Sequence, residues 1–320
     1  MTNKYLITGG FGFIGSNFIN FLYKELKAKN ESFEIHCIDN MTYASNILNV
    51  NLEIQKYEGF FHHKMDIASE SIGFILEENQ FNFCVNFAAE SHVDRSIKDP
   101  LIFAKTNVLG TVNLLNFWSK NQTSRFIQIG TDEVYGSVRL GTSDENYELQ
   151  PSSPYSSSKA SADLLALSFF YTFKTDVIVT RCTNNYGRNQ HAEKLIPTLI
   201  RSLNSDTNLK LYGNGLNVRE WIHVDDHIKA IITLAVATDL KHRIYNIGSG
   251  IRYSNLEIAQ MLIKISGSKS AAIEYISDRA GHDYRYAINS TRIRNELEWQ
   301  PEIDIEEGLV RTFDFYKNLN

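Results

Sequence analysis

A tyrosine and a lysine four residues apart, Tyr155 and Lys159, follow Pro154 at the start of an Ala- and Leu-rich stretch. On a helix, that spacing places both side chains on one face. Because an ammonium beside a phenol stabilises the phenolate, we expect Lys159 to lower the pKa of Tyr155 toward neutrality. Tyr155 can then act as a general base on a hydroxyl group while a hydride leaves the same carbon. The alternative is an exposed pair on a solvated helix surface.

A second group of reactive side chains, Thr131, Asp132 and Glu133, directly follows a short apolar run. In open α/β sheets, ligands bind at the carboxyl ends of the strands, which is where this triplet would lie. Two adjacent carboxylates that are both charged and shielded from water repel each other strongly. We therefore expect one of them to keep its proton, which sets an acid beside a base. A solvated turn is the alternative, since Asp and Glu are common in loops.

A glycine-rich segment, residues 8–15 (TGGFGFIG), separates the first apolar run from the first helical pattern. It satisfies GxGxxG from Gly10 and GxxGxxG from Gly9, and both patterns share Gly12 and Gly15. Glycines here allow a tight turn and let backbone N–H groups approach a pyrophosphate, which the helix N-terminus also attracts. Between a strand and a helix, the motif predicts a dinucleotide site, with a purely structural turn as the alternative.

Two aspartates close the next two strands of that unit. Asp39 ends the second apolar run, where a carboxylate can accept hydrogen bonds from both adenosine ribose hydroxyls and would repel a 2′-phosphate, so we expect NAD rather than NADP. Asp66, followed by Ile67, closes the third run and would lie near the adenine. The structural alternatives are a helix or turn cap after Asp39 and a helix N-cap at Asp66.

These side chains need a scaffold, and the first half of the chain alternates short apolar runs with helical patterns. The predicted strands cover residues 5–8, 34–39, 60–63, 83–87, 126–130 and 176–181, and the predicted helices cover 16–26, 69–78, 106–118 and 156–173. Such alternation predicts an α/β fold with a Rossmann-type doubly wound parallel sheet. The nearly continuous apolar strands fit a sheet covered on both faces.

The pattern changes after about residue 181. Residues 184–190 are polar, and helical patterns at 193–202, 225–237, 255–266 and 306–317 follow with short apolar pieces between them. We expect residues 1–181 to form the NAD-binding domain. Residues 182–320 would form a smaller mixed α/β substrate-binding domain, from which the strand at 243–247 could return to the first sheet.

Composition excludes several classes of function. The chain has 320 residues and a net charge of −5, without the basic excess typical of nucleic-acid binding. Cys37, Cys84 and Cys182 lie in apolar runs and are expected to be reduced, buried thiols. Without CxxC or HExxH, and with scattered histidines, we expect no metal site. No signal-peptide pattern or membrane-length apolar run is present, so we expect a cytoplasmic enzyme with no membrane partner.

Taken together, the motifs resemble the extended short-chain dehydrogenase/reductases and, among them, the dTDP-glucose 4,6-dehydratase family. The resemblance runs nearly end to end through residues 88–96 (AAESHVDRS), 131–136 (TDEVYG), 155–163 (YSSSKASAD), 184–187 (NNYG), 193–197 (EKLIP), 212–219 (YGNGLNVR) and 278–283 (DRAGHD). The Thr-Asp-Glu triplet distinguishes this family from the related 4-epimerases, which usually carry small or hydroxyl residues there.

The resemblance implies a lyase that uses bound NAD in deoxysugar biosynthesis. Tyr155, helped by Thr131, would take the C4 hydroxyl proton of the glucose and NAD the C4 hydride, with Lys159 on the nicotinamide ribose. Glu133 would then remove the acidified C5 proton while Asp132 protonates the departing C6 hydroxyl. The hydride would return to C6, giving a 4-keto-6-deoxy sugar nucleotide.

The resemblance also assigns binding residues and partners. The cofactor residues would be Gly9, Gly12, Phe13, Ile14, Gly15, Asp39, Thr42, Asp66, Ile67, Ala88, Ala89, Thr106, Tyr155 and Lys159. The substrate residues would be Ser91, His92, Thr131, Asn184, Glu193, Lys194, Leu195, Tyr212, Arg219, Arg279 and His282. Arg219 and Arg279 suit the diphosphate, because a guanidinium pairs with phosphate oxygens in a fork, and Tyr212 could stack on the base. The family implies a homodimer through residues 106–118 and 156–173.

Three departures from the family pattern surround the base and the diphosphate. Arg188 and Asn189 replace a Pro-aromatic pair, Lys210 replaces a proline, and Ile251 stands where an asparagine is frequent. These positions leave dTDP-glucose and UDP-glucose as alternative substrates. A 4-epimerase is a further alternative, and an NAD-binding regulator without catalytic activity is another.

Overall fold

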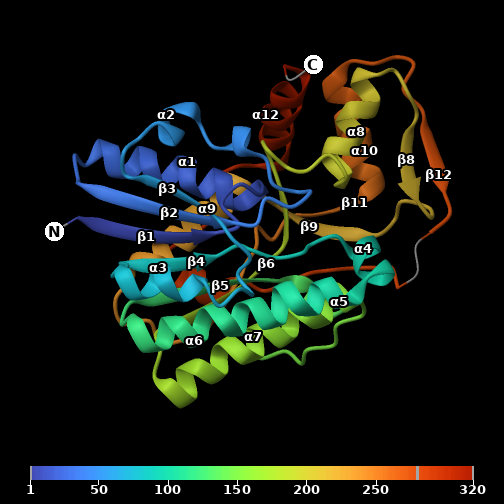
Figure 1. The fold of residues 1–320 in the computed structure, drawn as a ribbon. Coiled ribbons are helices and arrows are strands. Elements are labelled where there is room, and N and C mark those ends of the chain that lie inside the picture. Colours follow the sequence, from blue (N-terminus) through green and yellow to red (C-terminus); the bar gives the residue numbers. More distant parts are fainter. Residues whose placement is uncertain (1, 279–280, 319–320) are drawn as a thin grey trace.

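A seven-stranded parallel sheet forms the centre of the protein in a computed structural model, which describes residues 2–278 and 281–318 (Figure 1). Its strand order is β10-β6-β5-β4-β1-β2-β3, and β1 pairs with both β2 and β4, so the order reverses there. The strands are β1 (Asn3–Thr8), β2 (Phe33–Asp39), β3 (Phe60–Lys64), β4 (Phe83–Asn86), β5 (Arg125–Thr131), β6 (Val177–Cys182) and β10 (Ile244–Ile247). The reversal opens a crevice at the carboxyl ends of the strands, where α/β proteins bind ligands.

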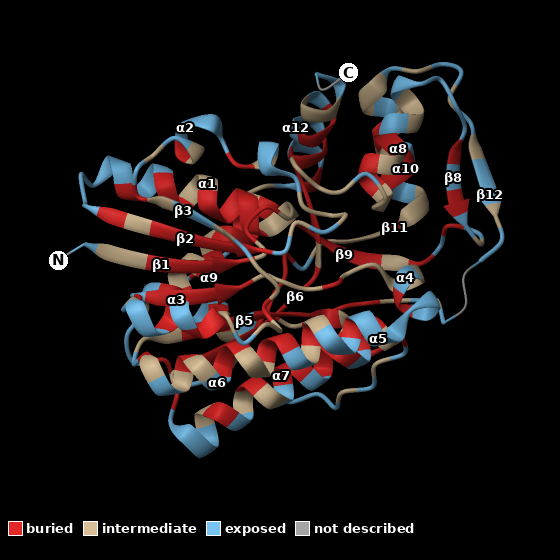
Figure 2. Cartoon of the chain, in the orientation of Figure 1, coloured by how far each residue is buried: buried red, intermediate tan, exposed pale blue. Residues whose placement is uncertain are grey.

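Helices cover both faces of this sheet, which explains its apolar strands. On one face, α1 (Phe13–Ala28) and α9 (Val224–Val236) contribute Phe18, Ile19 and Ile231 to a core that contains Ile7. On the other face lie α3 (Ile72–Glu78), α6 (Thr111–Asn121) and α7 (Pro154–Phe173), drawn below the sheet in Figure 1. The central strands of the sheet and the inner faces of these helices are buried, whereas the edge strand β3 and the outer faces of the helices are more exposed (Figure 2).

A second core lies beyond the carboxyl edge of the sheet, on the right of Figure 1. Its helices are α8 (Leu195–Asn204), α10 (Asn255–Ser266) and α12 (Ile305–Lys317), which bury Leu199, Leu262 and Leu309. They pack on two small sheets, one with β7 (Asn184–Tyr186), β9 (Val218–His223) and β11 (Arg252–Ser254), the other with β8 (Leu209–Tyr212) and β12 (Ile273–Ile276). The predicted α/β architecture with a second, smaller unit is therefore confirmed.

The remaining helices are short. They are α2 (Leu52–Gln55), α4 (Val93–Lys98), α5 (Pro100–Phe103), α11 (Thr291–Leu297), the 3₁₀ turns η1 (Ile47–Asn49) and η3 (Asp132–Tyr135), and the π-helix η2 (Ala104–Gly110). The helix predicted at residues 106–118 is thus a π-helix followed by α6. The predicted return of residues 243–247 to the first sheet is confirmed, because β10 pairs with β6. The predicted domain boundary after residue 181 falls one residue before β6 ends, and the division into domains stays a prediction.

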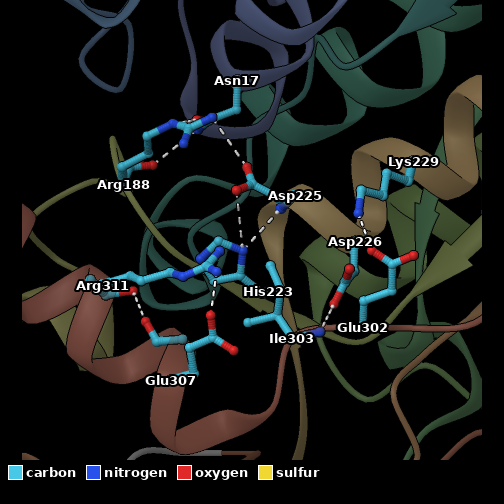
Figure 3. A network of polar contacts seen from close by, with 12 residues as sticks. Asn17, Arg188, His223, Asp225, Asp226, Lys229, Glu302, Ile303, Glu307 and Arg311 are labelled. Atoms are coloured by element: carbon cyan, nitrogen blue, oxygen red, sulfur yellow. Dashed lines mark hydrogen bonds and ion pairs between the residues drawn. The ribbon is translucent and has the colours of Figure 1, made fainter.

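A polar network joins the two units (Figure 3). Arg188, in the loop after β7, donates from Nε to Asn17 Oδ1 of α1 at 2.6 Å and forms an ion pair with Asp225 of α9 at 3.1 Å. Asp226 accepts the backbone N–H of Ile303 at 3.0 Å, in the segment before α12. The helix that follows the glycine-rich turn is therefore fastened to elements of the second half of the chain.

We predict that His227, in the first half of α9, makes the fold sensitive to acid. Its side chain is fully buried, its Nδ1 lies 2.8 Å from Asn185 Oδ1, and burial lowers its pKa to about 3. Below pH ~6.5 the unfolded chain binds a proton that the folded chain refuses, so stability falls as pH drops toward that lowered pKa. Between pH 7 and pH 4, the wild type should lose about 3 kcal/mol more unfolding free energy than His227→Gln.

Denaturant unfolding at both pH values measures this difference. His242→Gln is the matched control, because the His242 side chain is about half exposed. It should retain the acid sensitivity of the wild type. Equal pH slopes for the wild type and His227→Gln would contradict the prediction.

Candidate active site

Two adjoining clefts open at the carboxyl edge of the large sheet, and Gly9 and Gly12 line both. The first has a volume of about 240 Å³ and the second about 90 Å³. Of the predicted site residues, the first cleft is lined by Gly9, Gly12, Phe13, Ile14, Gly15, Ala89, Ser91, Thr131, Asp132, Glu133, Tyr155, Lys159, Asn184, Glu193 and Lys194. The second is lined by Gly9, Gly12, Asp39, Thr42, Asp66, Ile67, Ala88, Ala89 and Thr106. A larger cavity of about 1260 Å³ beside Arg188 and α12 contains none of the predicted catalytic side chains.

The glycine-rich turn packs so tightly at Gly9 and Gly15 that a side chain would not fit at either position. A Cβ on Gly9 would lie 2.7 Å from the backbone N of Ala88, and one on Gly15 would lie 2.3 Å from the carbonyl oxygen of Gly9. Gly9 also has a left-handed φ of 63°, which favours glycine. At Gly12 the only atom near a Cβ is the Gly9 carbonyl oxygen, at 3.3 Å. Its Cα therefore faces the clefts, as close approach of a pyrophosphate to the backbone requires.

We predict different effects for alanine at two of these glycines. Gly12→Ala should fold with nearly wild-type stability but lose NAD binding at least about tenfold, because its methyl group projects into the cleft. Gly15→Ala should also lower the melting temperature, because its methyl group would collide with the Gly9 backbone. Calorimetric titration with NAD and thermal denaturation separate the two effects. Undiminished NAD binding by Gly12→Ala would contradict a pyrophosphate at this turn.

Asp39 closes β2 and is buried. Its Oδ2 accepts the N–H of Phe11 at 2.9 Å, and its Oδ1 accepts the N–H of Met41 at 2.8 Å and the Ser45 hydroxyl at 2.7 Å. The turn-cap role considered for Asp39 is thus present in the ligand-free chain. The hydrogen bond from Phe11 to this carboxylate also holds the glycine-rich turn next to the end of β2, where the ribose would bind.

Asp66 does not cap a helix. Its Oδ1 accepts the N–H of Ala68 at 2.9 Å, whereas α3 begins only at Ile72. The helix N-cap considered for Asp66 is therefore wrong, and the carboxylate instead forms an ion pair with Lys105 at 3.1 Å. Lys105 and the cleft residue Thr106 belong to the π-helix η2, a distortion that is frequent at functional sites.

Helix α7 carries Tyr155 and Lys159 in its first two turns. A capping box between Ser153 and Ser156 and a proline at the first position define where the helix begins. Both functional side chains are buried, 9% and 4% exposed, which excludes an exposed surface pair. Lys159 Nζ donates to the carbonyl oxygen of Ile129 in β5 at 2.5 Å.

The expected lowering of the Tyr155 pKa is wrong. Burial raises the pKa of Tyr155 well above its usual value, the neighbouring carboxylate of Glu133 raises it further, and a hydrogen bond with Thr131 opposes this. The Lys159 ammonium is directed to the carbonyl oxygen of Ile129. Burial therefore favours the protonated phenol, which must lose its proton before it can act as a base.

Asp132 and Glu133 start the 3₁₀ turn η3 directly after β5. Thr131 is the N-cap, and its hydroxyl accepts the N–H of Glu133 at 3.3 Å. Asp132 is 3% exposed, and burial, followed by the charges of Glu133 and Glu220, raises its pKa well above the usual value. Burial therefore favours the protonated form of the Asp132 carboxyl beside the partly buried Glu133, which is the arrangement expected of an acid next to a base.

The loop before α8 brings a predicted substrate pair to the cleft. Lys194 Nζ donates to the carbonyl oxygen of Ser91 at 2.9 Å, and Glu193 forms an ion pair with Arg95 at 3.6 Å and lies 3.6 Å from His92 Nε2. The helix predicted from residue 193 begins only at Leu195, so Glu193 and Lys194 lie on a loop. This loop links the second unit to the segment that follows β4.

Five predicted substrate residues, His92, Leu195, Tyr212, Arg219 and His282, do not line either cleft. Arg219 is buried over the ring of Tyr286 at 4.4 Å and donates to the carbonyl oxygen of Asp283 at 2.9 Å. Tyr212 is 40% exposed at the end of β8, with its ring centre 6.3 Å from that of His282. The predicted residue Arg279 lies outside the described residues.

Sequence reasoning missed several residues that line the first cleft, namely Cys182, Thr183, Asn185, Gln190 and His191. The position of Cys182 at the end of β6 and of Asn185 in the Asn-Asn-Tyr-Gly segment were available signals. Cys37, Cys84 and Cys182 are free and buried in strands, as predicted. Among residues 2–278 and 281–318, no group of His, Cys, Asp or Glu is arranged to hold a metal ion.

Comparisons with known proteins identify the family of the chain. The family model for GDP-mannose 4,6 dehydratase matches residues 6–312. A dTDP-glucose 4,6-dehydratase of Streptomyces griseus is 43% identical over 317 residues, which is 99% of this chain and 94% of that protein. The crystal structure of DesIV, a dTDP-glucose 4,6-dehydratase of Streptomyces venezuelae with NAD bound, superposes with a TM-score of 0.92 at 38% identity and covers 98% of this chain and 97% of that one.

A UDP-glucose 4-epimerase of Thermotoga maritima also superposes with a TM-score of 0.89, over 99% of each chain. At 24% identity, that likeness shows the fold alone. The family model and the relatives that span nearly their full length are more specific. The chain belongs to the dTDP-glucose 4,6-dehydratase family, within the extended short-chain dehydrogenases/reductases.

Proposed function

We propose that the protein converts dTDP-glucose to dTDP-4-keto-6-deoxyglucose with bound NAD. The observation that carries the proposal is the meeting of Tyr155, Asp132 and Glu133 in one cleft with the glycine-rich turn. Oxidation by hydride transfer to NAD requires only the tyrosine and the glycine-rich turn. Removal of water from two neighbouring carbons additionally needs an acid and a base, which the raised pKa of Asp132 and the adjacent Glu133 supply.

Each catalytic side chain carries out a different proton transfer. Tyr155 accepts the proton of the C4 hydroxyl, aided by the Thr131 hydroxyl that hydrogen-bonds to it. Oxidation at C4 makes the C5 proton acidic, and Glu133 removes that proton. Asp132 donates its proton to the C6 hydroxyl, which leaves as water. NAD, when bound, would supply a reversible hydride acceptor between C4 and C6, and a proton from Glu133 or solvent returns to C5, so that no net oxidation occurs.

The cofactor residues fit NAD. Gly12 provides the close backbone approach to the pyrophosphate, Gly15 lets α1 pack against the turn, and Asp39 offers a carboxylate to the ribose hydroxyls. Lys159, buried beside Tyr155, would hold the nicotinamide ribose. In the second unit, Glu193 and Lys194 would contact the sugar and its phosphate.

Incubation of the purified protein with dTDP-glucose in deuterated water tests the function. We expect loss of water and one deuterium at C5 of the product, measured by mass spectrometry and NMR. UDP-glucose, assayed in parallel, decides between the nucleotides by the ratio of kcat/KM. Formation of dTDP-galactose without loss of water would instead indicate a 4-epimerase, and absence of turnover on every nucleotide hexose would support an NAD-binding regulator.

The family also supports a homodimer through the helices on the lower side of Figure 1. Large apolar side chains are exposed there, with Leu101 of α5 78%, Leu109 of η2 54% and Leu164 of α7 56% exposed. Exposed apolar side chains of this size on neighbouring helices are typical of association surfaces. Sedimentation equilibrium should give a dimer for the wild type and a monomer for Leu164→Glu.

The cytoplasm remains the expected location. Within the described part of the chain, every helix is too short or too polar to cross a bilayer.

A further inference from the structure

Helix α7 presents a third functional side chain below the tyrosine and the lysine. Asp163 follows Lys159 by four residues and Tyr155 by eight, so all three lie along one face of the helix. The exposed fraction decreases along this row, from 9% for Tyr155 to 4% for Lys159 and none for Asp163. Asp163 is the innermost member and does not line either cleft.

Asp163 forms a buried ion pair with Arg181 of β6. Arg181 Nε lies 3.0 Å from Asp163 Oδ2, and the two side chains are 2% and 0% exposed. Gly130 of β5 makes room for the carboxylate, because a Cβ there would lie 2.9 Å from Asp163 Oδ1. A buried pair seldom stabilises more than apolar side chains of the same volume would, so stability alone gives little reason for it.

From Arg181 the contacts continue to the turn that carries the acid and the base. Arg181 Nη1 donates to the Tyr135 hydroxyl at 2.9 Å, and that hydroxyl donates to Asn246 Oδ1 of β10 at 2.8 Å. Tyr135 is the last residue of η3, which begins with Asp132 and Glu133. Helix α7 and the turn η3 are therefore joined by charged and polar contacts that are hidden from water.

We propose that the Asp163–Arg181 pair is a positioning device, which sets the η3 turn against α7 so that Asp132 and Glu133 meet the sugar that Tyr155 oxidises. The proposal rests on the proposed function and names neither residue as catalytic, because neither lines the cleft. Through the backbone of α7 the pair positions Tyr155 and Lys159. Through Tyr135 it positions the turn η3, which carries the acid and the base.

Asp163 has a second effect, on the charge of Lys159. Burial lowers the pKa of Lys159, and the Asp163 carboxylate one turn away opposes this most strongly. Facing Lys159 from the other packed elements are the Cys182 thiol of β6 and the carbonyl oxygen of Ile129 of β5. Without the carboxylate, Lys159 should lose its proton at lower pH.

Asp163→Asn tests the proposal, with Asp176→Asn as a matched control. Asp176 pairs with Arg125 of β5 at 3.0 Å and with Arg243 at 2.5 Å, in partly exposed ion pairs at the amino ends of β5 and β6, away from the turn η3. Both variants should lower the melting temperature. Asp163→Asn should also lower kcat about 10- to 100-fold with KM within about twofold, because small misplacements of reacting groups slow the chemistry. Asp176→Asn should keep the wild-type kcat.

Two further readouts separate positioning from general destabilisation. In the pH profile of kcat, the alkaline limb is the fall in kcat at high pH. This limb should move to lower pH in Asp163→Asn, because Lys159 loses the neighbouring carboxylate, and it should stay in place in Asp176→Asn. Tyr135→Phe keeps the ion pair but removes the hydroxyl that connects it to η3, so it should lower kcat about tenfold without moving that limb. It also provides the test if Asp163→Asn fails to fold.

Hydrogen exchange of the amides of residues 131–136 makes the test independent of turnover. Exchange there should accelerate in Asp163→Asn relative to Asp176→Asn, even if the wild type proves inactive on dTDP-glucose. Inactive wild type with accelerated exchange would thus overturn the proposed function alone. The positioning role would be overturned if Tyr135→Phe kept the wild-type kcat. It would also be overturned if Asp163→Asn and Asp176→Asn had the same kcat, the same alkaline side of the pH profile and the same amide exchange rates at residues 131–136.

Discussion

Glu133→Gln is expected to stop the elimination of water while oxidation at C4 continues. Glutamine keeps the size of the side chain but cannot take up the C5 proton, and general bases contribute about 10²- to 10⁴-fold to rate. Product formation should therefore fall about 10²- to 10⁴-fold. Mass spectrometry of the quenched reaction should find a sugar nucleotide lighter than the substrate by H₂, and no deuterium should enter C5 in deuterated water.

Two features of the structure make this variant informative. Glu133 is partly buried in the cleft, and its backbone N–H, which donates to Thr131, holds the turn whatever the side chain. Glu148→Gln, at an exposed position in the loop after η3, provides the control and should turn over normally. A normal rate of dehydration by Glu133→Gln would remove this residue as the base and, with it, the reason to prefer a dehydratase.

Tyr155→Phe is expected to fail one step earlier. Without the phenol oxygen, the C4 hydroxyl proton has no acceptor of its own, so neither the 4-keto-glucose nucleotide nor the final product should form. The expected loss in kcat is about 10³-fold or more. The fold should be retained, because the aromatic ring remains to pack edge-on against Phe103, whose ring centre lies 6.3 Å away.

The two variants therefore stop the reaction at different stages. Single-turnover mass spectrometry should detect the oxidised sugar in Glu133→Gln and only the substrate in Tyr155→Phe. Tyr171→Phe, at an exposed position on the same helix, controls for loss of a phenol and should match the wild type. Accumulation of the 4-keto sugar by Tyr155→Phe would show that another group takes the C4 proton.

The raised pKa of Tyr155 gives this variant a further use. Burial and the Glu133 carboxylate raise the pKa of the phenol and so favour its protonated form. The purified wild type should therefore show no tyrosinate absorbance near neutral pH before NAD and substrate are added. A tyrosinate signal that appears on addition of ligands, and is absent in Tyr155→Phe, would place the ionisation in the complex.

Local patterns in the sequence determined the nucleotide-binding half of the protein. Short apolar runs in the sequence predicted the strands β1 to β6. The segment between β1 and α1 needs glycines because the backbone makes tight contacts at Gly9 and Gly15. The four-residue spacing of Tyr155 and Lys159 sufficed to put them on one helix face, because helix geometry is local. The predicted strand ends also located the triplet at Thr131, since parallel strands carry their ligands at their carboxyl ends.

Only the tertiary structure decided the charges at the site and the form of the second unit. The short strands β7, β9 and β11 are held by partners far away in the sequence, so no local period reveals them. The ionisation of Asp132 and Tyr155 depends on burial and on Glu133 and Glu220, and the Asp163–Arg181 pair joins residues of two elements. A pKa depends on the distance to every neighbouring charge and on the exclusion of water, and the fold sets both.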